Sequence, residues 1–135
     1  MYRIPRAGNP EATSRPAPRA FVVEDDIPTL QLLRDVARAA GLEPLAFTRL
    51  STAREALRRQ TPAVMVVDDD LPDGQGADLV LELRRDPRTR HVRVIFCTGA
   101  DARRRQEIGR LAPVIAKPFA LHDVERALAE LAATH

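Results

Sequence analysis

The sequence contains a single cysteine, Cys97, so an internal disulfide bond is excluded. Its three histidines are scattered without the spacing of zinc ligands, which argues against a zinc site. No apolar run is long enough to span a bilayer and none lies near Met1, so we expect a cytoplasmic protein without a membrane partner. A G-x-G-x-x-G or P-loop pattern is also missing, so a nucleotide-binding function has no motif to support it.

An excess of charge of one sign is absent too, because the net charge is only +2. Residues 1–19 carry four arginines against one acid, Glu11, together with four prolines and no apolar periodicity. We therefore predict a disordered, basic, proline-rich leader over residues 1–19 and one folded domain over residues 20–135. Since the basic excess lies in the leader, it is weak evidence for nucleic-acid binding, and we expect no nucleic-acid partner.

The most informative stretch is Val64–Gly74. Its first four residues, Val64–Val67, are apolar and stop at three consecutive carboxylates, Asp68, Asp69 and Asp70. A short apolar run rich in β-branched residues predicts a buried strand. In an open α/β sheet, ligands bind just beyond the carboxyl ends of the strands. Because neighbouring carboxylates repel one another, we expect a positively charged side chain close to this triplet.

Apolar runs and amphipathic segments alternate along the rest of the chain. The five predicted strands are Ala20–Val23, Leu45–Phe47, Val64–Val67, Val92–Cys97 and Val114–Ala116. Helices are predicted over Leu30–Ala40, from Ser51 or Thr52 to the Thr61-Pro62 break, and over Asp78–Arg85, Asp101–Leu111 and Leu121–Leu131. The alternation implies βαβ crossovers, so the predicted fold is α/β, a single doubly wound (βα)5 domain with a five-stranded parallel sheet.

Local patterns add detail to three of the connecting segments. Thr52 and Glu55 have the spacing of a capping box, which predicts the start of the second helix. Gly74 and Gly76 are expected to loosen the loop after the acidic triplet. Residues 101–111 are only weakly amphipathic, rich in arginine and interrupted by glycine, so we predict a short and loosely held helix there.

Several other residues are expected to have structural roles only. Cys97 lies in an apolar run and is interpreted as a small buried hydrophobe. Phe119 is interpreted as a core anchor, and Leu121 as part of the apolar face of the last helix. The arginines are interpreted as solvated faces, with binding of an acidic partner as the alternative; they are residues 84, 85, 88, 90, 93 and 103–105.

Polar side chains follow four of the predicted strands at their carboxyl ends. In strand order they are Glu24 with Asp25, Asp68 with Asp70, Thr98, and Lys117. In a doubly wound sheet these strand ends share one edge, so the side chains are expected to meet in one pocket. Lys117 would then be the positive partner that the acidic triplet requires.

This set of residues suits phosphoryl-transfer chemistry. Clustered carboxylates with a backbone carbonyl bind a hard divalent cation, for which Mg²⁺ is our prediction. A carboxylate can also act as a nucleophile and form an aspartyl phosphate. The transfer mainly requires neutralisation of the phosphoryl charge, which Mg²⁺ and Lys117 would supply, while Thr98 would donate a hydrogen bond.

Four separated motifs in order resemble the receiver domain of two-component response regulators, the CheY-like family. They are Val-Val-Glu-Asp-Asp (22–26), Val-Val-Asp-Asp-Asp-Leu-Pro (66–72), Cys-Thr-Gly (97–99) and Ala-Lys-Pro-Phe (116–119). The resemblance extends over about residues 20–131. It implies a flavodoxin-like strand order, 2-1-3-4-5, for the predicted sheet.

The resemblance also implies roles for the acidic residues. The family places its phosphoacceptor aspartate four residues before a proline, and Pro72 therefore selects Asp68. Asp25 and Asp68 are expected to bind Mg²⁺ directly and Glu24 to support it through water. The backbone carbonyl of Asp70 is expected to be a further ligand.

The remaining motifs complete the site that the resemblance implies. Thr98 corresponds to the hydroxyl that contacts the phosphoryl group, and Lys117 to the lysine of the family. The Lys117–Pro118 peptide bond is expected to be cis. The side chain of Asp70 and Ala100 occupy positions that tune the dephosphorylation rate in such domains.

One position departs from the family pattern. Receivers commonly carry Tyr or Phe three residues before the lysine, and this sequence has Val114 there. A coupled threonine–aromatic switch is therefore not expected. Movement of Thr98 and of the helix within residues 101–111 is our hypothesis for its replacement.

The resemblance implies a histidine kinase or a histidine phosphotransfer protein as phosphodonor and a downstream protein partner. The chain ends four residues after Leu131, so we expect a stand-alone receiver that signals through partner binding or an onward phosphorelay. It would catalyse only its own phosphorylation and dephosphorylation, so we do not expect an enzyme. The last helix and the fifth strand are a candidate homodimer face.

Two other functions remain as alternatives. The first is an interaction module of the same fold that works without phosphorylation, which Val114 favours. The second is a phosphohydrolase of the haloacid dehalogenase type, whose motif Asp68-x-Asp70 mimics, although Glu24 and Asp25 would then have no role. A purely solvated acidic loop at residues 68–70 is the non-functional interpretation.

Overall fold

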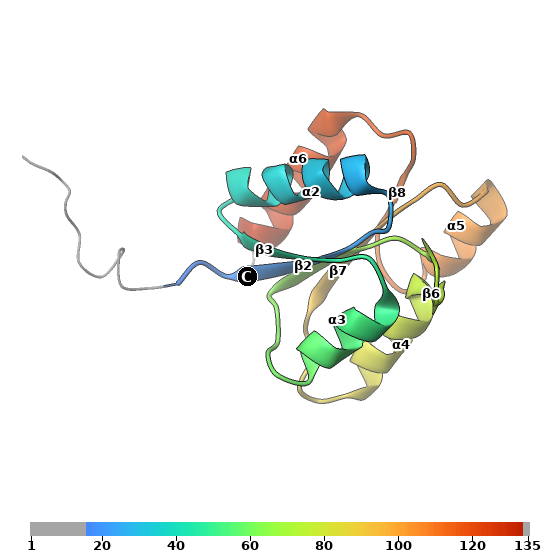
Figure 1. Ribbon diagram of the computed structural model, residues 1–135. Helices are drawn as coiled ribbons and strands as arrows, with labels where there is room; N and C mark the ends of the chain where they lie inside the picture. The colour runs from blue at the N-terminus through green and yellow to red at the C-terminus, as the bar shows by residue number, and fades with distance from the viewer. Residues whose placement is uncertain (1–15, 134–135) are drawn as a thin grey trace, which may run out of the picture.

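Five parallel strands form the central sheet in the computed structural model, which describes residues 16–133 (Figure 1). The strands are β2 (Arg19–Val23), β3 (Glu43–Phe47), β4 (Val64–Val67), β7 (Arg93–Thr98) and β8 (Val114–Ala116). Their spatial order is β3-β2-β4-β7-β8, and every neighbouring pair is parallel. Counted in chain order this is 2-1-3-4-5, so the predicted fold class and strand order are confirmed.

Helices cover both faces of this sheet, as Figure 1 shows. They are α2 (Ile27–Ala39), α3 (Leu50–Leu57), α4 (Gly76–Arg85), α5 (Ala102–Ile108) and α6 (Leu121–Ala133). The helices α2 and α6 pack side by side on one face, and α3 and α4 pack on the other together with Ile108 of α5. Among residues 16–133, no helix has both the length and the apolar character that crossing a bilayer requires.

β4 is apolar at all four positions, and β2 and β7 are apolar except at their ends, because both faces of the sheet are buried there. Alternate residues of one strand enter different cores, since successive side chains of a strand point in opposite directions. Phe21 and Val23 pack with α3 and α4, whereas Ala20 and Val22 pack with α2 and α6. Cys97 is buried in the α2–α6 core, which confirms its interpretation as a small hydrophobe, and burial raises the pKa of its thiol to about 12.

The structure corrects the prediction for the start of α3. No capping box forms, because the N-cap residue is Arg49 and its side chain makes no capping hydrogen bond. Instead, the carboxylate of Asp73 accepts hydrogen bonds from the backbone N–H groups of Leu50 (2.8 Å) and Ser51 (3.0 Å). These bonds hold the pKa of Asp73 below its ordinary value. A residue of a distant loop therefore caps this helix.

The segment after the acidic triplet is also more ordered than predicted. Asp70–Leu71 (β5) and Gly74–Gln75 (β6) form a small antiparallel hairpin, and Gly76 already belongs to α4. A Cβ atom at Gly76 would lie 2.2 Å from the carbonyl oxygen of Asp68 and 2.6 Å from Cγ1 of Val67. Gly76 thus allows α4 to begin directly against the end of β4, rather than loosening the loop.

The short helix predicted within residues 101–111 is confirmed as Ala102–Ile108, and it ends at Gly109. The expectation for Leu121 needs correction, because this first residue of α6 is 44% exposed, whereas Val124 and Leu128 of the same helix are buried. Phe119, half-buried, packs against the α2–α6 core as predicted. The leader predicted over residues 1–19 lies mostly outside the described residues, and β2 begins at Arg19.

Candidate functional site

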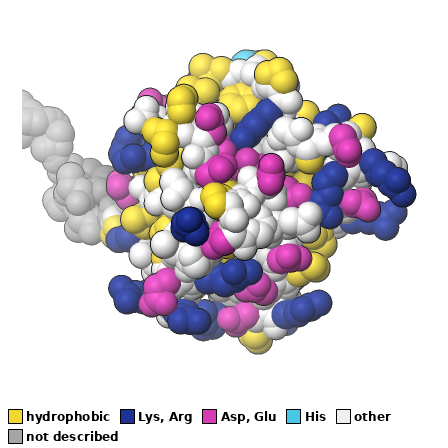
Figure 2. All heavy atoms as spheres, turned by 45° about the vertical axis from the view of Figure 1, so that its right-hand side comes forward, with side chains coloured by type: hydrophobic (Ala, Val, Ile, Leu, Met, Phe, Trp, Pro, Cys, Tyr) yellow, Lys and Arg dark blue, Asp and Glu magenta, His cyan; other side chains and the backbone are white. Residues whose placement is uncertain are grey.

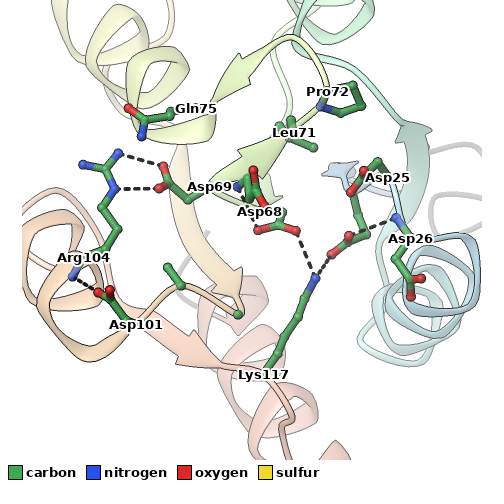
Figure 3. A pocket seen from close by; sticks show the side chains of 14 residues that line it. Asp25, Asp26, Asp68, Asp69, Leu71, Pro72, Gln75, Asp101, Arg104 and Lys117 are labelled. Carbon is green, nitrogen blue, oxygen red and sulfur yellow. Dashed lines mark hydrogen bonds and ion pairs between the residues drawn. The ribbon is translucent and has the colours of Figure 1, made fainter.

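A cleft of about 620 Å³ lies beyond the carboxyl ends of the strands (Figure 3). Residues that follow β2, β4, β7 and β8 line it, so the predicted convergence at one edge of the sheet is observed. Seven of its fourteen lining residues are Asp or Glu, and the two cations among them are Lys117 and Arg104. Figure 2 shows that acidic and basic side chains are otherwise interspersed over this side of the molecule. The cleft is therefore a local concentration of negative charge.

Lys117 joins the first and third strands of the chain at this cleft. Its Nζ atom lies 3.0 Å from Oδ2 of Asp68 and 2.5 Å from Oε1 of Glu24. Asp68 is buried, and its other oxygen, Oδ1, accepts a hydrogen bond of 3.1 Å from the N–H of Asp70. The positive partner that we predicted for the acidic triplet is thus Lys117, and the contact is made by Asp68 alone.

Glu24 and Lys117 modify each other's titration. Glu24 is only 1% exposed, and burial raises the pKa of its carboxyl, against the opposing effects of Lys117 and of the Asp26 N–H. Burial by itself lowers the pKa of Lys117, but the hydrogen bonds to Glu24 and Asp68 outweigh it, so the Lys117 pKa lies above its ordinary value. The ammonium group therefore stays charged at neutral pH.

Three carboxylates form a candidate cation site next to this lysine. One oxygen atom each of Glu24, Asp25 and Asp68 lies within 4.8 Å of the others. Asp25 is exposed, and within residues 16–133 its carboxylate has no hydrogen-bond or ion-pair partner. One ammonium group leaves this cluster with excess negative charge, and hard oxygen donors of this kind fit Mg²⁺. The Asp70 carbonyl as a further ligand stays a prediction.

Thr98 lies beneath the cleft rather than in its lining. The residue is fully buried at the end of β7, and its hydroxyl accepts a hydrogen bond of 3.3 Å from the N–H of Ala100. The backbone carbonyl of Thr98 accepts a further bond, 2.8 Å long, from the N–H of Lys117. Gly99 and Ala100 do line the cleft. The contact of Thr98 with a phosphoryl group stays a prediction.

Sequence reasoning missed an ion pair between Asp69 and Arg104. Asp69 is 3% exposed, and Arg104 approaches it with two nitrogens, Nε to Oδ2 at 2.7 Å and Nη2 to Oδ1 at 3.1 Å (Figure 3). Oδ1 also accepts a hydrogen bond of 3.0 Å from the N–H of Ala77 in α4. Arg104 is therefore not part of a solvated face. The two residues are 35 positions apart, so no local pattern could have paired them.

Two family-derived expectations concern β8. The Lys117–Pro118 peptide bond is cis, as predicted. Val114 is half-buried against the core under α3 and α4, in register with Phe96 of β7. No aromatic side chain is thus available at this position to report a change at the cleft.

Comparison with known proteins gives consistent matches. The family model described as "Response regulator receiver domain" matches residues 20–129. "Nodulation protein W" of Bradyrhizobium diazoefficiens is 38% identical over 97 residues, which are 70% of this chain and 40% of that protein. "Polar-differentiation response regulator DivK" of Brucella anthropi is 30% identical over 106 residues, 75% of this chain and 85% of that protein.

A solved structure shows the same fold. The structure described as a sensor protein from Polaromonas sp. JS666 has a TM-score of 0.76 and 28% identity, covering 88% of this chain and 98% of that chain. This chain spans less than half the length of Nodulation protein W, but most of the length of DivK.

Proposed function

This chain belongs to the response regulator receiver family, and on that premise we propose that Asp68 accepts a phosphoryl group from a phosphohistidine, with Mg²⁺ as cofactor. Receiver domains are signalling modules of two-component systems, and they interact with histidine kinases or phosphotransfer proteins and with downstream partners. The modified domain would signal through altered partner binding or pass the phosphoryl group onward.

The observation that carries this proposal is the different environment of three consecutive aspartates. Asp69 is paired with Arg104 and buried, and Asp70 is exposed on β5. Asp68 alone contacts Lys117 and shares the cation site with Glu24 and Asp25. A phosphoacceptor needs a carboxylate that faces the cleft next to positive charge, and Asp68, whose Oδ2 lies 3.0 Å from Nζ of Lys117, has this arrangement.

The proposed transfer is a balanced exchange of one bond for another. A carboxylate oxygen of Asp68 attacks phosphorus and forms the new O–P bond, while the N–P bond of the donor breaks. The electron pair of that bond stays on the imidazole nitrogen of the donor, which takes up a proton. Lys117 stays protonated, orients Asp68 and offers its positive charge to the phosphoryl oxygens.

The donor set at the cleft is consistent with a bound Mg²⁺. Asp25, Asp68 and the carbonyl of Asp70 would hold the ion directly, and Glu24 would hold it through water. When bound, the ion supplies additional positive charge for the phosphoryl oxygens. Without it, the cluster keeps the excess negative charge that opposes the approach of a phosphate donor.

Intact-mass measurement after incubation with Mg²⁺ and acetyl phosphate tests the proposal. We expect one phosphoryl adduct in the wild-type protein that requires Mg²⁺ and disappears in Asp68→Asn. The matched control is Asp70→Asn, which removes a neighbouring carboxylate that has no partner among residues 16–133 while leaving the backbone carbonyl in place, and it should keep the adduct. Absence of the adduct in the wild type, or its persistence in Asp68→Asn, would overturn the assignment.

A phosphorylation-independent interaction module remains the second candidate function, because Val114 replaces the aromatic residue common in the family. It predicts Mg²⁺ binding without an adduct in the same experiment. Membership of the receiver family leaves the haloacid dehalogenase alternative without support. The homodimer through α6 and β8 stays a prediction that sedimentation analysis would check.

A further inference from the structure

Helix α5 is attached to the rest of the domain by few side chains. Ile108 is its one buried residue, and Gly109 ends the helix directly after it. Nearer the other end, Arg104 forms the ion pair with Asp69, and Arg105 donates a hydrogen bond of 2.6 Å to the carbonyl of Ala100 in the loop before the helix. The apolar anchor Ile108, the ion pair of Arg104 and one hydrogen bond to the preceding loop therefore define the position of α5, and of these the ion pair alone reaches the acidic triplet.

The Asp69 carboxylate connects three parts of the molecule. It belongs to the residue that directly follows Asp68, the proposed phosphoacceptor. It accepts the N–H of Ala77 in the first turn of α4, and it pairs in a two-point geometry with Arg104 of α5. A change next to Asp68 can thus act on α5 through a single side-chain pair.

Arg104 is also positioned to sense charge in the cleft. It lines the same cleft as Asp68, and it lies across from Lys117, the other cation of the lining (Figure 3). Lys117 is already bound by Glu24 and Asp68. A phosphoryl group on Asp68 adds negative charge and new acceptor oxygens close to Asp69. A guanidinium group can bind such oxygens through two parallel N–H···O bonds, the bidentate geometry in which Arg104 binds Asp69 in this structure.

We propose that Arg104 is a phosphoryl-responsive positioning residue that passes the state of Asp68 to α5. This inference rests on the proposed function. In the unmodified protein, Arg104 pairs with Asp69 and holds the first turn of α5. After phosphorylation, the guanidinium turns from Asp69 to the phosphoryl oxygens, and α5 moves with it.

Two features of the structure allow this exchange. Asp69 keeps the N–H of Ala77 as a hydrogen-bond donor after Arg104 leaves, so its buried carboxylate is not left without a partner. Asp101 caps α5 by accepting the N–H of Arg104 at 2.9 Å, so the backbone of Arg104 is fixed within the first helical turn. A displacement of the side chain is therefore coupled to the whole short helix, and no aromatic residue at position 114 is needed.

Amide hydrogen exchange over residues 101–109, with and without acetyl phosphate and Mg²⁺, tests the inference. In the wild-type protein we expect exchange there to change on phosphorylation. In Arg104→Gln we expect exchange to be faster already in the unmodified protein, on the order of tenfold, and to change no further in the molecules that intact-mass measurement shows to carry the adduct. Arg103→Gln is the matched control, since Arg103 is exposed on the same helix, and it should behave as wild type.

The Nε–H resonance of Arg104 in NMR spectra gives a readout that a purely structural ion pair would not move. We expect it to shift on phosphorylation, and we expect Arg104→Lys, which keeps the charge without the two-point geometry, to retain only part of the exchange response. An adduct that forms in the wild type without changing this resonance or the exchange of α5 would overturn the inference alone. Failure of the adduct to form would overturn the proposed function and this inference together.

Discussion

Single residues at the end of β4 have roles that their sequence neighbours do not share. Asp68, Asp69 and Asp70 are chemically identical, yet they contact a lysine, an arginine and solvent, respectively. The cause is geometric, because successive residues at a strand end point to different sides. Asp68 points to the cleft and Asp69 toward the first turn of α4.

Gly76 permits this arrangement, and we expect Gly76→Ala to destabilise the protein. Alanine is favoured over glycine in a helix by up to about 1 kcal/mol, but its Cβ would overlap the backbone carbonyl of Asp68 at 2.2 Å. The overlap should prevail because a backbone atom must move, so we expect a net loss of about 1–3 kcal/mol in the free energy of unfolding, measured by urea titration.

Gly99→Ala is the control for this substitution. The Cβ atom at position 99 would meet nothing nearer than Cβ of Lys117 at 4.0 Å, an ordinary contact. We expect a change within about 0.5 kcal/mol. Equal effects of the two alanine variants would show that the close approach of α4 to β4 is not the cause.

Among the secondary-structure elements, the short hairpin β5–β6 has two functions. It begins two residues after the proposed phosphoacceptor, and its turn residue Asp73 caps α3 through the N–H groups of Leu50 and Ser51. The start of α3 and the loop after Asp68 are thus held together by one carboxylate. The hairpin is therefore a structural link between the site and the start of α3.

We expect Asp73→Ala to lower the free energy of unfolding at neutral pH because two helix N–H groups lose their acceptor. The folded-state pKa of Asp73 is lowered by these bonds. Its stabilisation is therefore complete above the pKa of an unfolded aspartate, and it is lost as the pH falls through the folded-state pKa. Urea titrations in a pH series should show the wild type and Asp73→Ala converging in acid.

Glu55→Ala separates this explanation from the capping box that the sequence suggested. Glu55 is exposed, and its ion-pair partners among residues 16–133 are Arg58 and Arg59 of its own segment. Exposed ion pairs of this kind contribute little to stability. We therefore expect Glu55→Ala to lose less free energy of unfolding than Asp73→Ala, and its stability should not converge with that of the wild type in acid. A larger loss of unfolding free energy in Glu55→Ala than in Asp73→Ala would support the capping box as the cap of this helix.

For the molecule as a whole, the relevant feature is the uneven distribution of charge. The chain has a net charge of +2, whereas the cleft lining contains seven acids and two cations. A cation that binds this cleft only in the folded state must stabilise the fold by mass action. Stability should therefore depend on Mg²⁺ even when no phosphoryl group is transferred.

We expect the unfolding temperature to rise when Mg²⁺ is added. The free energy of unfolding should increase by about 2.7 kcal/mol at a Mg²⁺ concentration 100 times the Kd. Asp25→Asn should weaken this response, because Asp25 is the cluster member without another partner within residues 16–133. Asp35→Asn, an exposed acid on α2 away from the cleft, should respond as wild type. Equal Mg²⁺ responses in the two variants would contradict the proposed cation site.

Much of the fold was determined by the sequence alone. The apolar runs predicted all five strands of the sheet, and the strand-end residues Glu24, Asp25, Asp68 and Lys117 were expected at one edge. Such predictions succeed because periodicity and burial are local properties of the chain. The family motifs added the strand order and the cis peptide bond at Pro118.

Only the tertiary structure decided which of these residues are partners. Asp73 caps a helix 23 residues earlier, Arg104 binds a carboxylate 35 residues earlier, and Lys117 contacts Glu24 across 93 residues. No local pattern encodes such distances, because they depend on how the strands are ordered and how each helix meets the sheet. The sequence therefore determined the elements and the chemistry of the site, whereas the packing of those elements selected Asp68 for Lys117 and Asp69 for Arg104.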